Sequence, residues 1–165
     1  MVKVDIFGLA LDETSKAPIL VLKEAGGGER VLPIWIGAME AMAISVAINA
    51  VPFPRPMTHD LLLSAIGNLG GQVAQVEVTD IREGTFYAEI IVAQGNETRR
   101  VDSRPSDAIA LAVRAKCPIL VAERVLAEGG GPMQQGAKRV IKTDDADKWA
   151  EELEKFSEDE TKYKM

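Results

Sequence analysis

The sequence has little of what most readily identifies a function, because it contains one cysteine, one histidine and few aromatic residues. The single cysteine, Cys117, excludes an internal disulfide, so the cytoplasm is the expected location. One histidine and one cysteine cannot supply the usual ligand set of a zinc site. No apolar run reaches the roughly 18 residues that span a bilayer, and residues 1–5 begin a strand-like alternation rather than a signal peptide. No membrane association is therefore expected.

Positive charge is also scarce, since 19 lysines and arginines face 25 aspartates and glutamates, for a net charge of −6. This balance weighs against strong binding to nucleic acid of any sequence, which needs a surplus of basic residues facing phosphates. However, nine of the acidic residues fall between residues 144 and 160. The rest of the chain is close to neutral, so a local basic patch remains compatible with the sequence.

What the sequence does contain is the patterning of one globular domain. Apolar alternation and β-forming residues predict seven strands, at residues 2–11, 17–23, 30–36, 72–81, 85–92, 97–101 and 117–121. Runs of helix formers predict three helices, at residues 38–51, 58–69 and 105–114. Tight glycine turns join several of the strands. The predicted fold class is therefore α+β, a mostly antiparallel sheet with three packed helices.

The glycine-rich segment at residues 129–132 breaks this patterning and predicts a domain boundary. Residues 1–128 are expected to form a single compact domain. Residues 129–165 are expected to form a glycine-rich linker and a short, acidic, helical C-terminal tail. Within that tail, the spacing of Trp149, Leu153 and Phe156 predicts an amphipathic helix at residues 145–156.

Two of the predicted helices begin with the same order of residues: arginine, proline, then serine or threonine, and aspartate. These helix starts lie at residues 54–60 and 102–107. Thr58 and Ser106 are interpreted as helix caps, and the two aspartates that follow them as first-turn carboxylates that the helix dipole favours. Capping does not explain the histidine and the arginine of the first start.

If the two helix starts face each other, one cleft collects groups suited to phosphate chemistry. Helix N-termini attract anions, arginine binds phosphate through two hydrogen bonds, and histidine can act as a general base. Carboxylates could hold Mg²⁺ or Mn²⁺, with Glu40, near the start of the apolar helix 38–51, as a further candidate. Together these groups suit metal-assisted phosphodiester hydrolysis.

The alternative interpretation is that the same groups form structural ion pairs that hold loops to the core. Arg104 would then pair with Asp102 or Asp107. Arg55 would pair with Asp60. In this case the carboxylate of the helix at residues 38–51 would only complement its dipole.

Four sequence blocks carry a family resemblance. They are LPIWIG at residues 32–37 followed by Glu40 and Ala41, PRPMTHDLL at 54–62, GTFYA at 84–88, and DSRPSDAIALA at 102–112. In this order, across residues 2–126, they resemble the signature blocks of the bifunctional nuclease domain family. The resemblance implies a compact α+β domain that is commonly a dimer in bacterial members. The name of the family comes from plant members described as cutting both RNA and DNA.

Two hypotheses follow from the residues and the resemblance. The first is a metal-assisted nuclease of low sequence specificity that acts on RNA or DNA. Its catalytic residues would be His59, Asp60, Asp102 and Asp107, its substrate-binding residues Arg55, Arg104, Thr58 and Ser106, and its Mg²⁺ or Mn²⁺ ligands Asp60, Asp102, Asp107 and Glu40. The second is a non-catalytic, homodimeric binding or regulatory protein that uses the same cleft for an anionic ligand. The helix at residues 38–51 and the apolar strands would then form its dimer interface.

Overall fold

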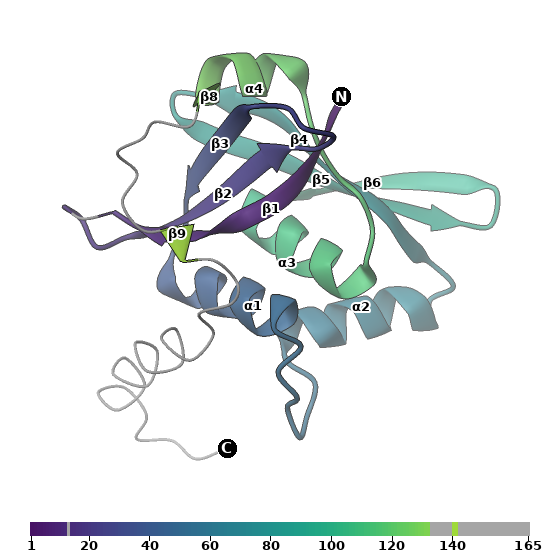
Figure 1. Ribbon diagram of the computed structural model, residues 1–165. Coiled ribbons are helices and arrows are strands. Elements are labelled where there is room, and N and C mark those ends of the chain that lie inside the picture. The colour runs from purple at the N-terminus through teal and green to yellow at the C-terminus, as the bar shows by residue number, and fades with distance from the viewer. Residues whose placement is uncertain (13, 133–139, 142–165) are drawn as a thin grey trace.

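The computed structural model describes residues 1–12, 14–132 and 140–141, which form one mixed sheet with helices packed on it (Figure 1). The longer strands of this part of the chain are β1 (Val2–Leu11), β2 (Pro18–Glu24), β3 (Arg30–Trp35), β4 (Gln72–Arg82), β5 (Thr85–Gln94), β6 (Glu97–Ser103) and β7 (Ile119–Val121). Two short strands, β8 (Gly131–Pro132) and β9 (Val140–Ile141), extend the sheet. The strand order is β6-β5-β4-β7-β1-β2-β3-β8, and β9 pairs with β1.

The sheet consists of two antiparallel meanders that a single short strand connects. β1, β2 and β3 form the first meander, and β4, β5 and β6 form the second. β7 lies between them, antiparallel to β1 and parallel to β4. Glu83 and Gly84, which join β4 to β5, have φ angles of 49° and 75°, as tight hairpin turns require. The mostly antiparallel sheet is confirmed in outline, with the β4–β7 pair running parallel.

Three helices form a layer on one side of the sheet, and a fourth packs elsewhere (Figure 1). The layer contains α1 (Ala38–Ile48), α2 (Thr58–Asn68) and α3 (Pro105–Ala115). α3 is the central helix, since it contacts α1, α2, β4 and β5. The fourth helix, α4 (Glu123–Gly129), contacts β3 and β4. The three predicted helices are present, and the seven-residue α4 was not predicted because its short segment contains no full amphipathic repeat.

The apolar core is shared by both meanders and by α3. Ile109 and Leu111 of α3 are completely buried, as are Leu22 of β2 and Val76 of β4. α1 buries a narrower stripe, and α2 has no buried residue. Burial of apolar surface is the main source of folding free energy, so α3 is held mainly by the core. α2 adds only the partly buried Leu63 and Ile66 to this core, so polar contacts must also hold it.

The C-terminal part of the chain is described only in short pieces. Gly131–Pro132, inside the predicted linker, pairs with β3. The helix predicted at residues 145–156 lies outside the described residues. In the part of the chain that is described, no helix has the length and apolar character needed to cross a membrane.

We predict that Leu111→Ala lowers the free energy of unfolding by about 2–5 kcal/mol, because Leu111 is fully buried and its truncation leaves a cavity. The matched control is Leu61→Ala in α2, the same substitution within a helix, at a side chain that is 62% exposed. The control should change the unfolding free energy by only about 0.5 kcal/mol. Urea denaturation of both variants measures the difference, and equal losses would contradict this assignment of the core.

Candidate functional site

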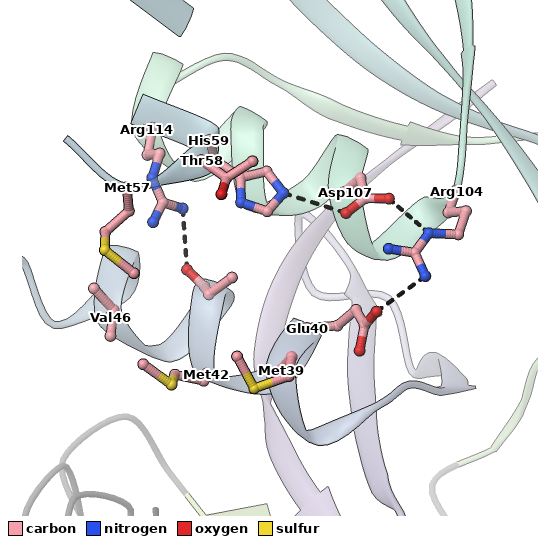
Figure 2. Close-up of a pocket in the computed structure, with 11 residues that line it drawn as sticks. Met39, Glu40, Met42, Val46, Met57, Thr58, His59, Arg104, Asp107 and Arg114 are labelled. Atoms are coloured by element: carbon pink, nitrogen blue, oxygen red, sulfur yellow. Dashed lines mark hydrogen bonds and ion pairs between the residues drawn. The ribbon is translucent and has the colours of Figure 1, made fainter. Parts of the chain in front are cut away.

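α1, the first turns of α2 and α3, and Arg114 from the last turn of α3 line a cavity of about 270 Å³ (Figure 2). One side of the cavity is apolar and contains Met39, Met42, Val46 and Met57. The other side is polar and contains Glu40, Thr58, His59, Arg104, Asp107 and Arg114. The two Arg-Pro helix starts therefore approach each other, which is the condition that the hypothesis of a shared cleft required. A cavity with an apolar side and several convergent polar groups is a typical candidate site for a ligand.

A chain of polar contacts runs along the polar side of the cavity (Figure 2). His59 Nε2 lies 3.3 Å from Asp107 Oδ1. Arg104 donates from Nε to Asp107 Oδ2 at 2.6 Å and from Nη1 to Glu40 Oε1 at 2.9 Å. The first helix start thus supplies the histidine, the second supplies the aspartate and the arginine, and α1 supplies the glutamate.

The environment of Asp107 determines how its hydrogen bond to His59 is arranged. Burial raises the pKa of the Asp107 carboxyl, but the hydrogen bonds from Arg104 and His59 outweigh burial, so the pKa lies below its ordinary value. Asp107 is therefore ionised at neutral pH and can only accept hydrogen bonds. Nε2 of His59 must then carry the proton, which leaves Nδ1 of the neutral ring with its lone pair. This is the tautomer that a general base requires.

Glu40 lies in the first turn of α1, and its side chain turns back toward Gly37. A Cβ atom at Gly37, the residue that precedes this helix, would collide with the Glu40 carboxylate. This position favours a carboxylate through the helix dipole, as the sequence predicted. The same carboxylate accepts a hydrogen bond from Arg104 of the second helix start, so Glu40 also joins α1 to α3.

Asp60 lies beside the cavity and is engaged in a different set of contacts. Its Oδ2 accepts a hydrogen bond from the Met57 N–H at 2.9 Å, and its Oδ1 accepts one from Arg114 Nε at 2.6 Å. These two hydrogen bonds, that of Met57 first, lower the pKa of the Asp60 carboxyl. Arg114 also donates from Nη1 to the carbonyl oxygens of Ala43 and Ala110. Arg114 therefore connects α1, α2 and α3.

The two predicted helix caps, Thr58 and Ser106, are wrong. α2 begins with Thr58 itself, Met57 occupies the cap position, and Asp60 satisfies the free N–H of Met57 from inside the helix. α3 begins with Pro105, which places the cap at Arg104 and puts Ser106 inside the first turn, where it is buried. Proline is favoured at the first helical position, and this preference excludes Ser106 from the cap.

Two further predicted site residues lie outside the cavity. Arg55 does not pair with Asp60, and it lines a second cavity of about 430 Å³ together with Phe53. Asp102 lies on β6, opposite Glu89 of β5, and is exposed. Of the predicted catalytic residues, only His59 and Asp107 are thus brought into one cavity.

The four predicted Mg²⁺ or Mn²⁺ ligands are not grouped around one point in the structure. Among the residues that the structure describes, no three His, Cys, Asp or Glu side chains are grouped closely enough to hold a metal ion. Glu40 and Asp107 both bind Arg104, and Asp60 binds Arg114. Asp102 lies on another element. The four carboxylates as arranged therefore do not fit the oxygen-rich coordination that these ions prefer.

Arg114 and the three methionines are cavity residues that the sequence reasoning missed. A signal for Arg114 was present, since it follows Asp107 by seven residues, or two helical turns, and so shares its face of α3. No local signal marks Met39, Met42 and Met57, because methionine in an apolar helix is ordinarily a core residue.

We predict that Asp60→Asn lowers the free energy of unfolding at pH 7 by about 1–3 kcal/mol, since it removes a charge-assisted hydrogen bond to Arg114. The folded-state pKa of Asp60 is lowered. Its contribution to stability is therefore complete above the ordinary aspartate pKa of about 4 and is lost as the pH falls through the folded-state pKa. The difference between the two proteins should be largest near neutral pH and vanish in strong acid.

Urea denaturation between pH 2 and pH 7 measures this difference, and the matched control is Asp102→Asn. Asp102 is exposed, so its substitution should change the unfolding free energy by no more than about 0.5 kcal/mol. A constant difference across the pH range for Asp60→Asn would contradict the assigned ion pair with Arg114.

Comparisons with known proteins agree with the four sequence blocks. A family model described as "Bifunctional nuclease domain" matches residues 20–134. An uncharacterized protein of Mycobacterium tuberculosis (strain ATCC 25618 / H37Rv) is 39% identical over 166 aligned residues, which cover 98% of this chain and 99% of that protein.

Two plant relatives carry the family's name. Bifunctional nuclease 2 of Oryza sativa subsp. japonica is 33% identical, over 75% of this chain and 39% of that protein. Bifunctional nuclease 1 of Arabidopsis thaliana is 32% identical, over 67% of this chain and 35% of that protein. The aligned part is thus little more than a third of either plant protein. The family model covers more than half of this chain, and the chain therefore belongs to the bifunctional nuclease domain family.

Proposed function

We propose that the protein is a nuclease that hydrolyses phosphodiester bonds of RNA and DNA with low sequence specificity. The observation that carries the proposal is the line of contacts from His59 through Asp107 to Arg104 at the rim of the cavity. In the proposed mechanism His59 is the general base, Asp107 orients this base, and Arg104 binds the phosphate. Membership in a family whose plant members are named nucleases supports the same activity.

The geometry supports a simple hydrolytic step. Nδ1 of His59 accepts a proton from a water molecule as the water oxygen attacks phosphorus, and Asp107 stabilises the imidazolium that forms. The bond from phosphorus to the leaving sugar oxygen breaks, and this oxygen takes up a proton from solvent. The Arg104 side chain is 65% exposed, and its remaining N–H groups can donate to the non-bridging phosphate oxygens. In this proposal the side chains contact the phosphate and not the bases, which is consistent with low sequence specificity.

Assistance by Mg²⁺ or Mn²⁺ was part of the sequence hypothesis, and a bound ion would supply Lewis-acid activation of the phosphate. Glu40, Asp60 and Asp107 are paired with arginines, so the proposed step uses only the side chains of this protein. Metal dependence is instead one of the variables of the assay.

The second candidate function is a non-catalytic dimer that binds an anionic ligand in the same cavity. Exposed apolar side chains favour it. Met39 of α1 is 72% exposed, and Leu69, at the end of α2, is 76% exposed. Exposed apolar side chains on both helices are compatible with a protein interface. The dimer would retain the cavity and its ion pairs but would not turn over nucleic acid.

We predict that the tag-free protein cleaves single-stranded RNA and DNA, and that His59→Ala lowers the rate by about 100-fold or more, since a general base contributes at least this factor. Cleavage of labelled oligonucleotides is measured with Mg²⁺, with Mn²⁺ and with EDTA. The control Arg99→Ala removes an exposed arginine that lines neither cavity and should leave the rate unchanged. Equal rates for wild type and His59→Ala would remove this site from the reaction, and no cleavage under any condition would favour the dimeric binding protein.

Asp107→Asn should lower the rate by at least about tenfold, because an amide does not hold His59 in the required tautomer. The double variant His59→Ala/Asp107→Asn should be no slower than His59→Ala alone, since the two residues act as a unit. Multiplicative losses in the double variant would show that Asp107 acts independently of His59.

A further inference from the structure

Arg55 differs from the other arginines that the structure describes. The structure describes eight arginines, and the seven other than Arg55 form ion pairs with carboxylates of described residues. They lie at positions 30, 82, 99, 100, 104, 114 and 124. Arg55 forms none within the same part of the chain. It lies in the loop between α1 and α2, which projects away from the helix layer (Figure 1). Its positive charge is therefore available to an anionic ligand.

An exposed aromatic ring accompanies Arg55. Phe53 is 41% exposed, and both side chains line the cavity of about 430 Å³ beside the loop. This cavity shares Val46 and Arg114 with the cavity that contains His59. The two cavities are therefore neighbours, and an extended ligand can enter both.

Prolines fix the backbone that presents these two residues. Pro52, Pro54 and Pro56 alternate with Phe53 and Arg55. Each proline fixes its own φ angle and restricts the residue before it to extended geometry. The loop therefore loses little backbone entropy when it binds a ligand, as a preorganised binding segment should.

An arginine and an aromatic ring at one cavity are the groups that bind a nucleotide in a single strand. The guanidinium binds the phosphate, and the ring stacks on the base, which is exposed only where no second strand covers it. We propose that the Phe53–Arg55 cavity binds one nucleotide of a single-stranded nucleic acid, next to the phosphodiester bond placed at His59. The proposal rests on the proposed nuclease function and assigns single strands as its substrate class.

Binding without turnover tests this assignment. The full 165-residue chain carrying His59→Ala is titrated against fluorescein-labelled oligothymidylate of about 12 nucleotides and against a duplex of equal length, with fluorescence anisotropy as the readout. The single strand should bind more tightly than the duplex. Adding Phe53→Ala should raise Kd for the single strand about tenfold, whereas Phe53→Trp should retain the affinity.

The salt dependence separates the phosphate contact from the stacking contact. Each phosphate neutralised on a single strand contributes about −0.7 to the slope of log K against log salt concentration. Arg55→Ala should therefore make the slope shallower by about 0.7, and Phe53→Ala should leave it unchanged. Matched controls are Arg99→Ala, with the same change in charge, and Tyr87→Ala, which removes another exposed ring; neither residue lines the two cavities.

The outcomes distinguish this assignment from the proposed hydrolysis. If the wild type does not cleave but Phe53→Ala and Arg55→Ala weaken binding as expected, the nucleotide site stands without the nuclease. If the wild type cleaves but these variants bind as tightly as the His59→Ala protein, the nucleotide site is wrong and the nuclease stands. Equal affinity for duplex and single strand, or no binding to either, also overturns the nucleotide site.

Discussion

The ion pair between Arg114 and Asp60 is the contact on which the arrangement of the helix layer depends. The Arg114 side chain is only 9% exposed, and its guanidinium also binds carbonyl oxygens of α1 and α3. α2 has no buried residue, so it has no apolar anchor comparable to that of α3. Removing the carboxylate would leave a largely buried guanidinium with only carbonyl oxygens as partners, which is more costly than losing a fully exposed pair. The position of α2, and with it that of His59, therefore depends on this interaction together with the partly buried Leu63 and Ile66, which pack against the core.

α3 combines this anchoring role with a role in the site. Its first turn carries Asp107, which contacts His59, and two turns later Arg114 holds α2, the helix that carries His59. Both contacts start from a helix whose apolar face is fixed in the core. The distance between the histidine and its aspartate is thus set by one rigid element. This arrangement meets the general requirement that a functional group be held by supporting contacts.

The sequence predicted those parts of the structure that local physics determines. Strand alternation and the helix starts follow from patterns within a few residues. For Arg104 the sequence offered two nearby partners, Asp102 and Asp107, and the structure shows the i, i+3 pair with Asp107. The pairs of Asp60 with Arg114 and of Glu40 with Arg104 do not follow from such patterns, because they depend on how three helices cross. The misplaced cap at Thr58 has a local cause, since the helix begins at Thr58 itself and Asp60 accepts the hydrogen bond of the Met57 N–H. The two Arg-Pro starts did converge, but the arginine that pairs with Asp60 could not be assigned from sequence spacing alone.

The position of β7 has a consequence for how the protein folds. This strand of three residues joins the two meanders, pairing Val4 with Ile119 on one side and Val76 with Ile119 on the other. Loop closure over such separations is slow, and contacts far apart in sequence lower folding rates. During synthesis, the two hairpin systems can form as they emerge, but the single sheet cannot close until Val121 has left the ribosome. α1 follows the first meander and α3 follows the second, so the cavity between them is complete only after this closure.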